Sequence, residues 1–215
     1  MTTEMGRATD RLLPLGAPAD GAWIAERAVR EVLTEAARAV RGTAPEPPRF
    51  RLAVAADEQP FPVPPGGLPP GELGITLRFA AVVGRPLPEL AGRLRAVLLR
   101  AAEETFGLVV AAVDLRVTEL LDTPPDPVTP APPPGRTSPP APADPAALAA
   151  LAVDGVAALT DAHGGPVRRA AGDLRLELAV TAGRRPLDVA RAVRTAVTAA
   201  APEATTVTVV VSELR

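Results

Sequence analysis

The chain has 215 residues, of which 47% are hydrophobic and only 2% aromatic, and it carries a formal net charge of −2. It contains no cysteine, which excludes disulfide frameworks, thiolate nucleophiles and zinc–thiolate sites. The small net charge gives no global attraction to nucleic acid or to an anionic membrane, and the length suffices for two small domains.

The basic residues and the apolar runs carry information about origin and location. All 23 basic residues are arginine, a bias typical of a high-GC genome such as that of an actinobacterium. No apolar run approaches the roughly 20 residues that span a membrane, and residues 1–20 lack the apolar core of a signal peptide. We therefore expect a cytoplasmic protein without a direct membrane span.

The first predicted elements are a disordered tail and a helix. Residues 1–20 mix charge, glycine and proline without a period. A helix is predicted from about 21 to 40, because apolar residues recur on one side and charged residues occupy the rest. Asp20 is the candidate N-cap and Gly42 the candidate C-terminal stop.

A strand and a long loop follow. Residues 49–55 alternate as a strand, with Phe50, Leu52 and Val54 predicted to face the core. Residues 57–72 contain six prolines, which forbid regular strand pairing. A loop of this length is either disordered or a binding feature, and disorder is the favoured interpretation.

The next block reads as strand, helix, strand. Residues 73–83 alternate with a period of two, which predicts a strand with one buried face. Between 87 and 101 the apolar residues recur at three and four, which predicts an amphipathic helix. Alternation at 113–117 predicts another strand, and this first unit closes near Leu121.

The block at residues 75–120 recurs at 174–214, which indicates a tandem repeat. Gly84 aligns with Gly183 at the turn, and Glu119 aligns with Glu213 near the end. In the second copy a helix is predicted at about 145–162, followed by a short strand, a second strand, a helix and a final strand.

The predicted fold class is α+β, with two copies of an α-β-β-α-β unit. Each unit is expected to be a small three-stranded sheet packed against two helices. The predicted organisation is a tail at 1–20, a first domain at 21–121, a proline-rich linker at 122–145 and a second domain at 146–215.

No constellation of residues predicts catalysis. The single histidine, His163, has no cysteine or second histidine with which to form a metal site or a triad, and it is interpreted as a helix C-terminal residue. The chain also lacks GxGxxG, P-loop, HExxH and GxSxG motifs. We expect no catalytic, metal or cofactor site, and no enzyme activity.

Two arginine-bearing features are candidate contact sites. The turns Gly84-Arg85 and Gly183-Arg184-Arg185 each precede a helix, where free N–H groups favour the binding of anions. A tight turn between a strand and a helix also requires glycine, and this structural interpretation of the same residues is favoured. The exposed sheet face of the first unit is predicted to carry a second set, Arg49, Arg51 and Arg78, with Arg116 and Asp114. No aromatic residue accompanies this set for base stacking, so a solvated face is favoured over a nucleic-acid site.

The repeated block resembles a known family. The segments IAERAVREV, LGITLRFAAVVGRPLPELAGRLRAVLLRAAEETFGLVVAAVDLRVTEL, LRLELAVTAGRRPLDVARAVRTAVTAA and VTVVVSEL are similar to the alkaline-shock-protein family of envelope stress proteins. The resemblance implies a non-enzymatic cytoplasmic protein that self-associates or is held at the membrane by an integral partner. The leading prediction is therefore a scaffold or adaptor, and the alternative is an RNA- or phosphate-binding module that uses the arginine face and turns.

Overall fold

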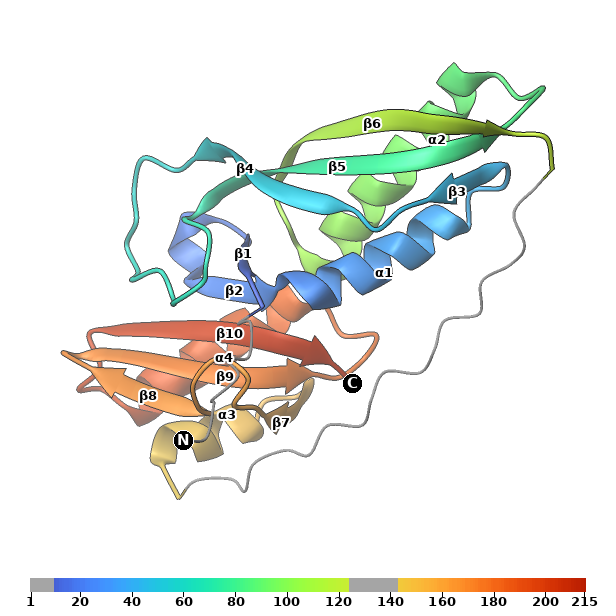
Figure 1. Ribbon diagram of the computed structural model, residues 1–215. Coiled ribbons are helices and arrows are strands. Elements are labelled where there is room, and N and C mark those ends of the chain that lie inside the picture. Colours follow the sequence, from blue (N-terminus) through green and yellow to red (C-terminus); the bar gives the residue numbers. More distant parts are fainter. Residues whose placement is uncertain (1–9, 124–142) are drawn as a thin grey trace, which may run out of the picture.

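The computed structural model describes residues 10–123 and 143–215, and in these residues the chain is a mixed α+β protein with four helices and ten strands in two sheets (Figure 1). The predicted linker lies largely in 124–142, outside the described residues. The four-stranded sheet is called sheet B and the six-stranded sheet is called sheet A.

Sheet B is a four-stranded sheet with β5 at its centre. Strand β6 pairs with β5 in parallel, while β3 and β4 pair with different stretches of the opposite edge of β5, both antiparallel. Helices α1 and α2 lie against one face of this sheet (Figure 1). The elements are α1 (Glu26–Arg38), β3 (Thr43–Pro45), β4 (Arg49–Ala55), β5 (Gly71–Val82), α2 (Leu87–Arg100), a π-helical turn (Ala101–Phe106) and β6 (Val110–Leu121).

Sheet A is a six-stranded sheet with β10 and β9 at its centre. Its order is β1-β2-β10-β9-β7, with β8 also paired to β9, and helices α3 and α4 lie on one face. The elements are β1 (Leu12–Leu15), β2 (Ala22–Ala25), α3 (Pro145–Leu151), β7 (Val156–Leu159), β8 (Val167–Ala170), β9 (Asp173–Val180), α4 (Pro186–Ala200) and β10 (Thr206–Leu214).

The two sheets share a local plan. In both, a strand, a helix and a second strand form a parallel pair: β5-α2-β6 and β9-α4-β10. The turn before each helix contains a glycine with φ of 84°, at Gly84 and Gly183. A Cβ at either position would meet no atom within 4 Å, so these glycines are required by the backbone conformation and not by lack of space.

One continuous apolar cluster links the two sheets. It contains Phe79 and Phe106 from the sheet B side and Leu176 and Val209 from the sheet A side. A smaller cluster lies on the opposite face of sheet A, where Trp23 packs with Val210 and Leu12. Sheet A is therefore packed on both faces.

The N-terminal segment differs most from the sequence-based prediction. Residues 1–9 of the predicted tail lie outside the described residues, but residues 12–15 form β1 instead of disordered chain. The predicted helix at 21–40 begins only at Glu26, because residues 22–25 form β2, which pairs in parallel with β10. Asp20 does not cap that helix; its carboxylate accepts a hydrogen bond from the N–H of Ala17.

The proline-rich loop at 57–72 is also a structured feature and not a disordered one. Its backbone pairs with β1 through the N–H of Leu12 to the oxygen of Gly66 at 3.0 Å, and the N–H of Leu68 to the oxygen of Leu12 at 2.8 Å. The indole N–H of Trp23 donates to the oxygen of Leu68 at 2.9 Å. The loop thus closes the outer face of sheet A.

Three further predictions were wrong in detail. The helix predicted at 145–162 ends at Leu151, because Gly155 (φ 92°) turns the chain into β7. The sheets have four and six strands instead of three each, since β1, β2, β3 and β7 were not predicted. Val54 is exposed although the alternation placed it in the core.

Candidate functional site

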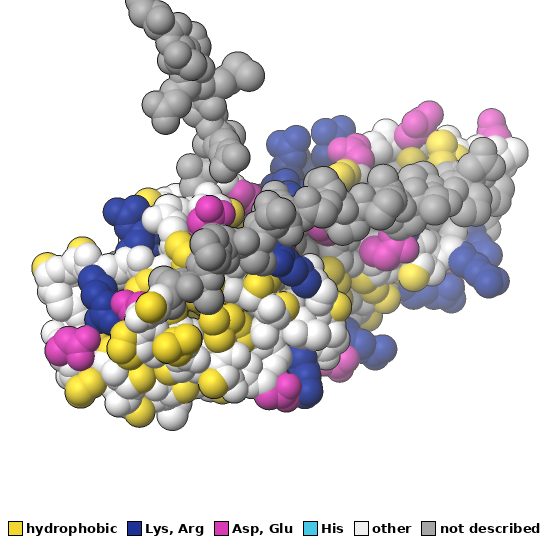
Figure 2. All heavy atoms as spheres, turned by 90° about the horizontal axis from the view of Figure 1, so that it is seen from below, with side chains coloured by type: hydrophobic (Ala, Val, Ile, Leu, Met, Phe, Trp, Pro, Cys, Tyr) yellow, Lys and Arg dark blue, Asp and Glu magenta, His cyan; other side chains and the backbone are white. Residues whose placement is uncertain are grey.

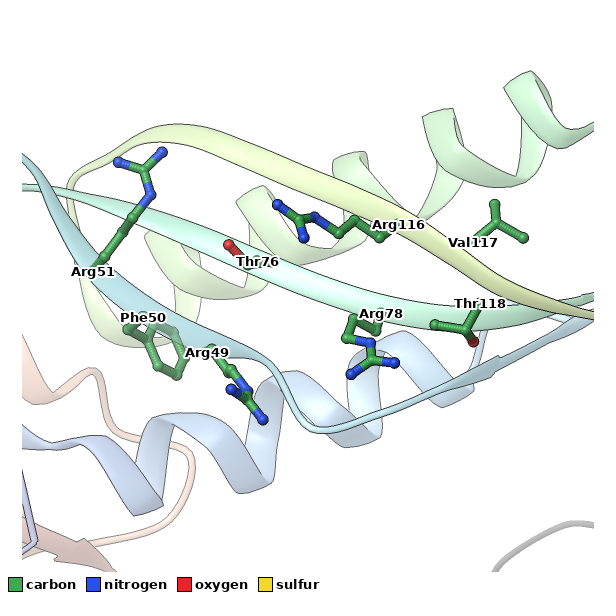
Figure 3. Close-up of a pocket in the computed structure, with 8 residues that line it drawn as sticks. All are labelled: Arg49, Phe50, Arg51, Thr76, Arg78, Arg116, Val117 and Thr118. Atoms are coloured by element: carbon green, nitrogen blue, oxygen red, sulfur yellow. The ribbon is translucent and has the colours of Figure 1, made fainter.

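The arginine face predicted from the sequence is present on sheet B. A shallow hollow of about 630 Å³ lies over β4, β5 and β6 on the side away from α1 and α2 (Figure 3). Figure 3 shows arginines from all three strands on this side, with Arg116 pointing toward Thr76. The lining residues are Arg49, Phe50, Arg51, Thr76, Arg78, Arg116, Val117 and Thr118.

The hollow has more positive than negative charge. Arg51 pairs with Asp114 at 3.2 Å, and Arg78 pairs with Glu46 at 3.6 Å. All four of these side chains are about half exposed, so the pairs are weak. Within the described residues, Arg49 and Arg116 have no acidic partner.

The hollow offers no aromatic surface for a nucleic-acid base. Phe50 is the one aromatic residue in the lining, but its side chain is buried under the sheet. Proteins that read single strands stack bases on exposed aromatic rings. The site therefore has the charge but not the stacking surface of such a protein.

Beside the hollow, β6 is a free edge. It pairs with β5 on one side, and no strand in the described parts of the chain pairs with its other side. Val117 is 43% exposed and Leu120 is 58% exposed. The register shifts near Ala111 and Thr118 are bulges that interrupt the edge, and they leave a regular stretch between them.

The two glycine turns are not part of the hollow. Arg184 pairs with Asp154 at 2.8 Å, and Arg185 donates to the backbone oxygen of Glu103 at 3.0 Å. Arg185 thus connects the sheet A side of the molecule to the π-helical turn. Arg85 packs beside Gly42. The structure therefore does not bring these turns together with Arg49, Arg51 and Arg78.

Sequence analysis missed a buried polar network in sheet A. Glu177 is 1% exposed, and its carboxylate accepts hydrogen bonds from the N–H of His163 at 2.8 Å and from the hydroxyl of Thr160 at 3.1 Å. The hydroxyl of Thr160 lies 2.7 Å from that of Ser212. His163 lies in the loop before β8 and not at a helix end. The sequence feature that could have indicated this network is the glutamate among the apolar residues of β9.

The remaining surface includes an apolar area but no metal site or membrane-spanning helix among the described residues. Figure 2 shows hydrophobic side chains gathered on the side of the molecule where α3 lies, and Leu148 of that helix is exposed. Among the residues that the structure describes, no group of histidine and carboxylate side chains is arranged to hold a metal ion. No helix in the same residues has the length and apolar character needed to cross a membrane.

Comparison with known proteins adds no assignment. No family model, curated protein sequence or solved structure matches this chain. The surfaces of the molecule are therefore the basis for a proposed function.

Proposed function

We propose that the protein is a non-enzymatic adaptor that binds an acidic, extended segment of a partner protein on the open face and free edge of sheet B. The observation that carries the proposal is the arginine hollow, where Arg49 and Arg116 have no acidic partner and no described element covers the face. An extended segment could add to β6 by main-chain pairing and place carboxylates over the arginines.

The choice of partner follows from charge. Two copies of this face placed together would oppose arginine to arginine, and like-charge contacts disfavour association. A partner protein with an acidic segment is therefore favoured over self-association through the face. In the alkaline-shock family that the chain resembles, such a partner would be an integral membrane protein at the cytoplasmic side.

The proposed ancestry is a tandem duplication of one α-β-β-α-β unit. It is supported by the common order and parallel pairing of β5-α2-β6 and β9-α4-β10, and by the matched glycine turns. The second copy carries no equivalent open face, because loop 57–72, which is hydrogen-bonded to β1, covers the outer side of sheet A. We therefore propose that the copy that contains β5 and β6 binds the partner, and that the copy that contains β9 and β10 supports it structurally.

Affinity capture from the protein's own cells tests the proposal. The bait is the full chain, compared with a double variant Arg49→Gln and Arg116→Gln. A second double variant, Arg93→Gln and Arg95→Gln on the exposed side of α2, has the same change in net charge and serves as the control. We expect one protein partner to be retained by wild type and control, and lost from the hollow variant.

Other outcomes decide against this function. A partner retained equally by both variants would place the interface elsewhere. Nuclease-sensitive capture of RNA, with affinity that falls steeply as salt rises, would favour the alternative RNA-binding module. A concentration-dependent dimer that is abolished by Val117→Lys would show that the β6 edge serves self-association.

A further inference from the structure

A second pocket lies between the proline-rich loop and the outer face of sheet A. It has a volume of about 520 Å³, within the range typical of pockets that enclose small molecules. Pro62, Pro64 and Pro65 contribute apolar surface, and residues of β8, β9 and β10 contribute polar groups. No residue lines both this pocket and the arginine hollow, so the two sites are independent.

Three of the polar residues form a row across the sheet. Arg168 of β8 is directly opposite Arg175 of β9, and Arg175 is in register with Thr208 of β10. Side chains in register on neighbouring strands project from the same face. The two guanidinium groups and the hydroxyl therefore share one wall of the pocket.

The two arginines are a like-charge pair. Arg168 donates to the backbone oxygen of Gly164 at 3.2 Å and Arg175 to that of His163 at 3.0 Å, but neither forms an ion pair with a described residue. Burial and the neighbouring Arg168 lower the pKa of Arg175, and the charge of Glu177 opposes this. Like charges opposite one another on adjacent strands destabilise a sheet, and an anion between them removes that repulsion.

The hydroxyl of Thr208 also lacks a partner. Thr208 is 3% exposed, and its Oγ1 makes no hydrogen bond within the described structure. Native proteins seldom leave a buried hydroxyl unsatisfied, and such a group calls for an explanation. The one carboxylate of the lining, that of Asp173, already accepts a hydrogen bond from Thr206 at 2.5 Å.

We propose that this pocket binds a small organic anion. Its carboxylate or phosphate group lies between Arg168 and Arg175, with the hydroxyl of Thr208 as a third hydrogen-bond donor. Its apolar part packs against the prolines of the loop. Because the ligand contacts both the loop and the sheet, its binding holds the loop onto sheet A.

Calorimetric titration and thermal unfolding of the full chain test this site with three simple probes. Benzoate carries a carboxylate, phenyl phosphate carries a phosphate, and phenol is the neutral analogue. We expect at least one of the two anions to bind saturably in the millimolar range and to raise Tm, while phenol does neither. Which anion binds more tightly distinguishes a carboxylate ligand from a phosphate ligand.

Variants give the site a signature that a purely structural role would not produce. Arg168→Gln should raise the Tm of the ligand-free protein, because the like-charge pair is removed, yet weaken anion binding about tenfold or more. Thr208→Val, which keeps the shape without the hydroxyl, should likewise raise the ligand-free Tm and weaken binding severalfold. Arg95→Gln, on the exposed side of α2, makes the same change in charge away from both sites and should alter neither quantity.

Two results overturn the proposal. The first is that neither benzoate nor phenyl phosphate binds better than phenol across the millimolar range. The second is that an anion binds, but with the same affinity to wild type, Arg168→Gln and Thr208→Val. Both results leave the adaptor function untouched, since Arg49 and Arg116 lie on the other sheet.

Discussion

The outer faces of the two sheets differ although both sheets contain the same strand-helix-strand unit with a parallel pair of strands. Arg78 on β5 aligns with Glu177 on β9. Arg78 is half exposed on the open face of sheet B, whereas Glu177 is 1% exposed beneath the cover of sheet A. The difference teaches that a residue on the outer face of such a unit acquires its role from what packs over it, and not from its position along the strand.

The cover of sheet A is supplied by the other half of the chain. Loop 57–72 connects β4 and β5 of sheet B, and β1 and β2 precede every strand of sheet B, yet the loop packs on sheet A, and β1 and β2 are strands of sheet A. The ring of Phe61 lies over Gly21, and the guanidinium carbon of Arg194 lies 4.4 Å from the centre of that ring. Sheet A therefore has no open outer face, and it has a pocket between the loop and the sheet instead.

The largest expected effect comes from truncating Trp23, the side chain of sheet A to which loop 57–72 is hydrogen-bonded. Trp23 is 1% exposed and donates to Leu68, so Trp23→Ala should lower the free energy of unfolding by about 3 to 5 kcal/mol. Val117→Ala at the free edge of sheet B should cost under about 1 kcal/mol. Chemical denaturation of both variants measures the contrast, and equal losses would show that the cover does not stabilise sheet A.

The aligned residues Arg78 and Glu177 allow the open face of sheet B and the covered face of sheet A to be compared at equivalent positions. Each oxygen of Glu177 accepts one hydrogen bond, and Glu177→Gln replaces one of these oxygens with an NH₂ group that cannot accept, so we expect a loss of about 1 to 3 kcal/mol. Arg78→Gln removes only a half-exposed ion pair and should cost under about 1 kcal/mol. Urea unfolding of the two variants checks both values. A larger loss for Arg78→Gln would contradict the assignment of the open and covered faces.

The smallest expected effect is a difference in pH dependence. Burial opposes ionisation of Asp20, but hydrogen bonds from Arg191 and from the N–H of Ala17 outweigh it and lower its pKa below 3.8. A lowered folded pKa stabilises the protein above the unfolded value, and the stabilisation is lost as pH falls through the folded pKa. Asp20→Asn should therefore cost about 1 kcal/mol at neutral pH and progressively less below pH 3.8.

The control for this prediction lies on the open face. Asp114→Asn removes a half-exposed ion pair with Arg51 and should cost a few tenths of a kcal/mol or less at neutral pH. Stability curves measured from neutral to acidic pH should converge for Asp20→Asn and wild type. If they stay parallel, the carboxylate of Asp20 is not the source of the difference.

Local periodicity was sufficient to predict the strand-helix-strand core of each sheet. The strands β4, β5, β8, β9 and β10 and the helices α2 and α4 lie close to their predicted positions, because each carries an uninterrupted period. The arginine face was predicted as well, since alternate residues of β4 and β5 must share a side. These predictions needed only neighbours in sequence.

Features that depend on distant pairing could not be predicted in this way. Residues 22–25 are apolar throughout, which is compatible with a strand or with the start of a helix. The strand forms because these residues pair with β10. The prolines of 57–72 indicated an irregular loop, but the loop packs against Trp23, which lies 45 residues before Leu68, and against β8, β9 and β10, which come much later in the chain. The roles of His163, Glu177 and Thr208 likewise arise from contacts between separate strands.

The central position of β10 has a consequence for the order of folding. All strands of sheet B lie within residues 43–121, so that sheet can form early during synthesis. Strand β2 gains its parallel neighbour only when residues 206–214 have been made, and such long-range pairing is slow. Until then the indole of Trp23 remains without its partner Val210, and the nascent chain must keep an apolar N-terminal hairpin from aggregating.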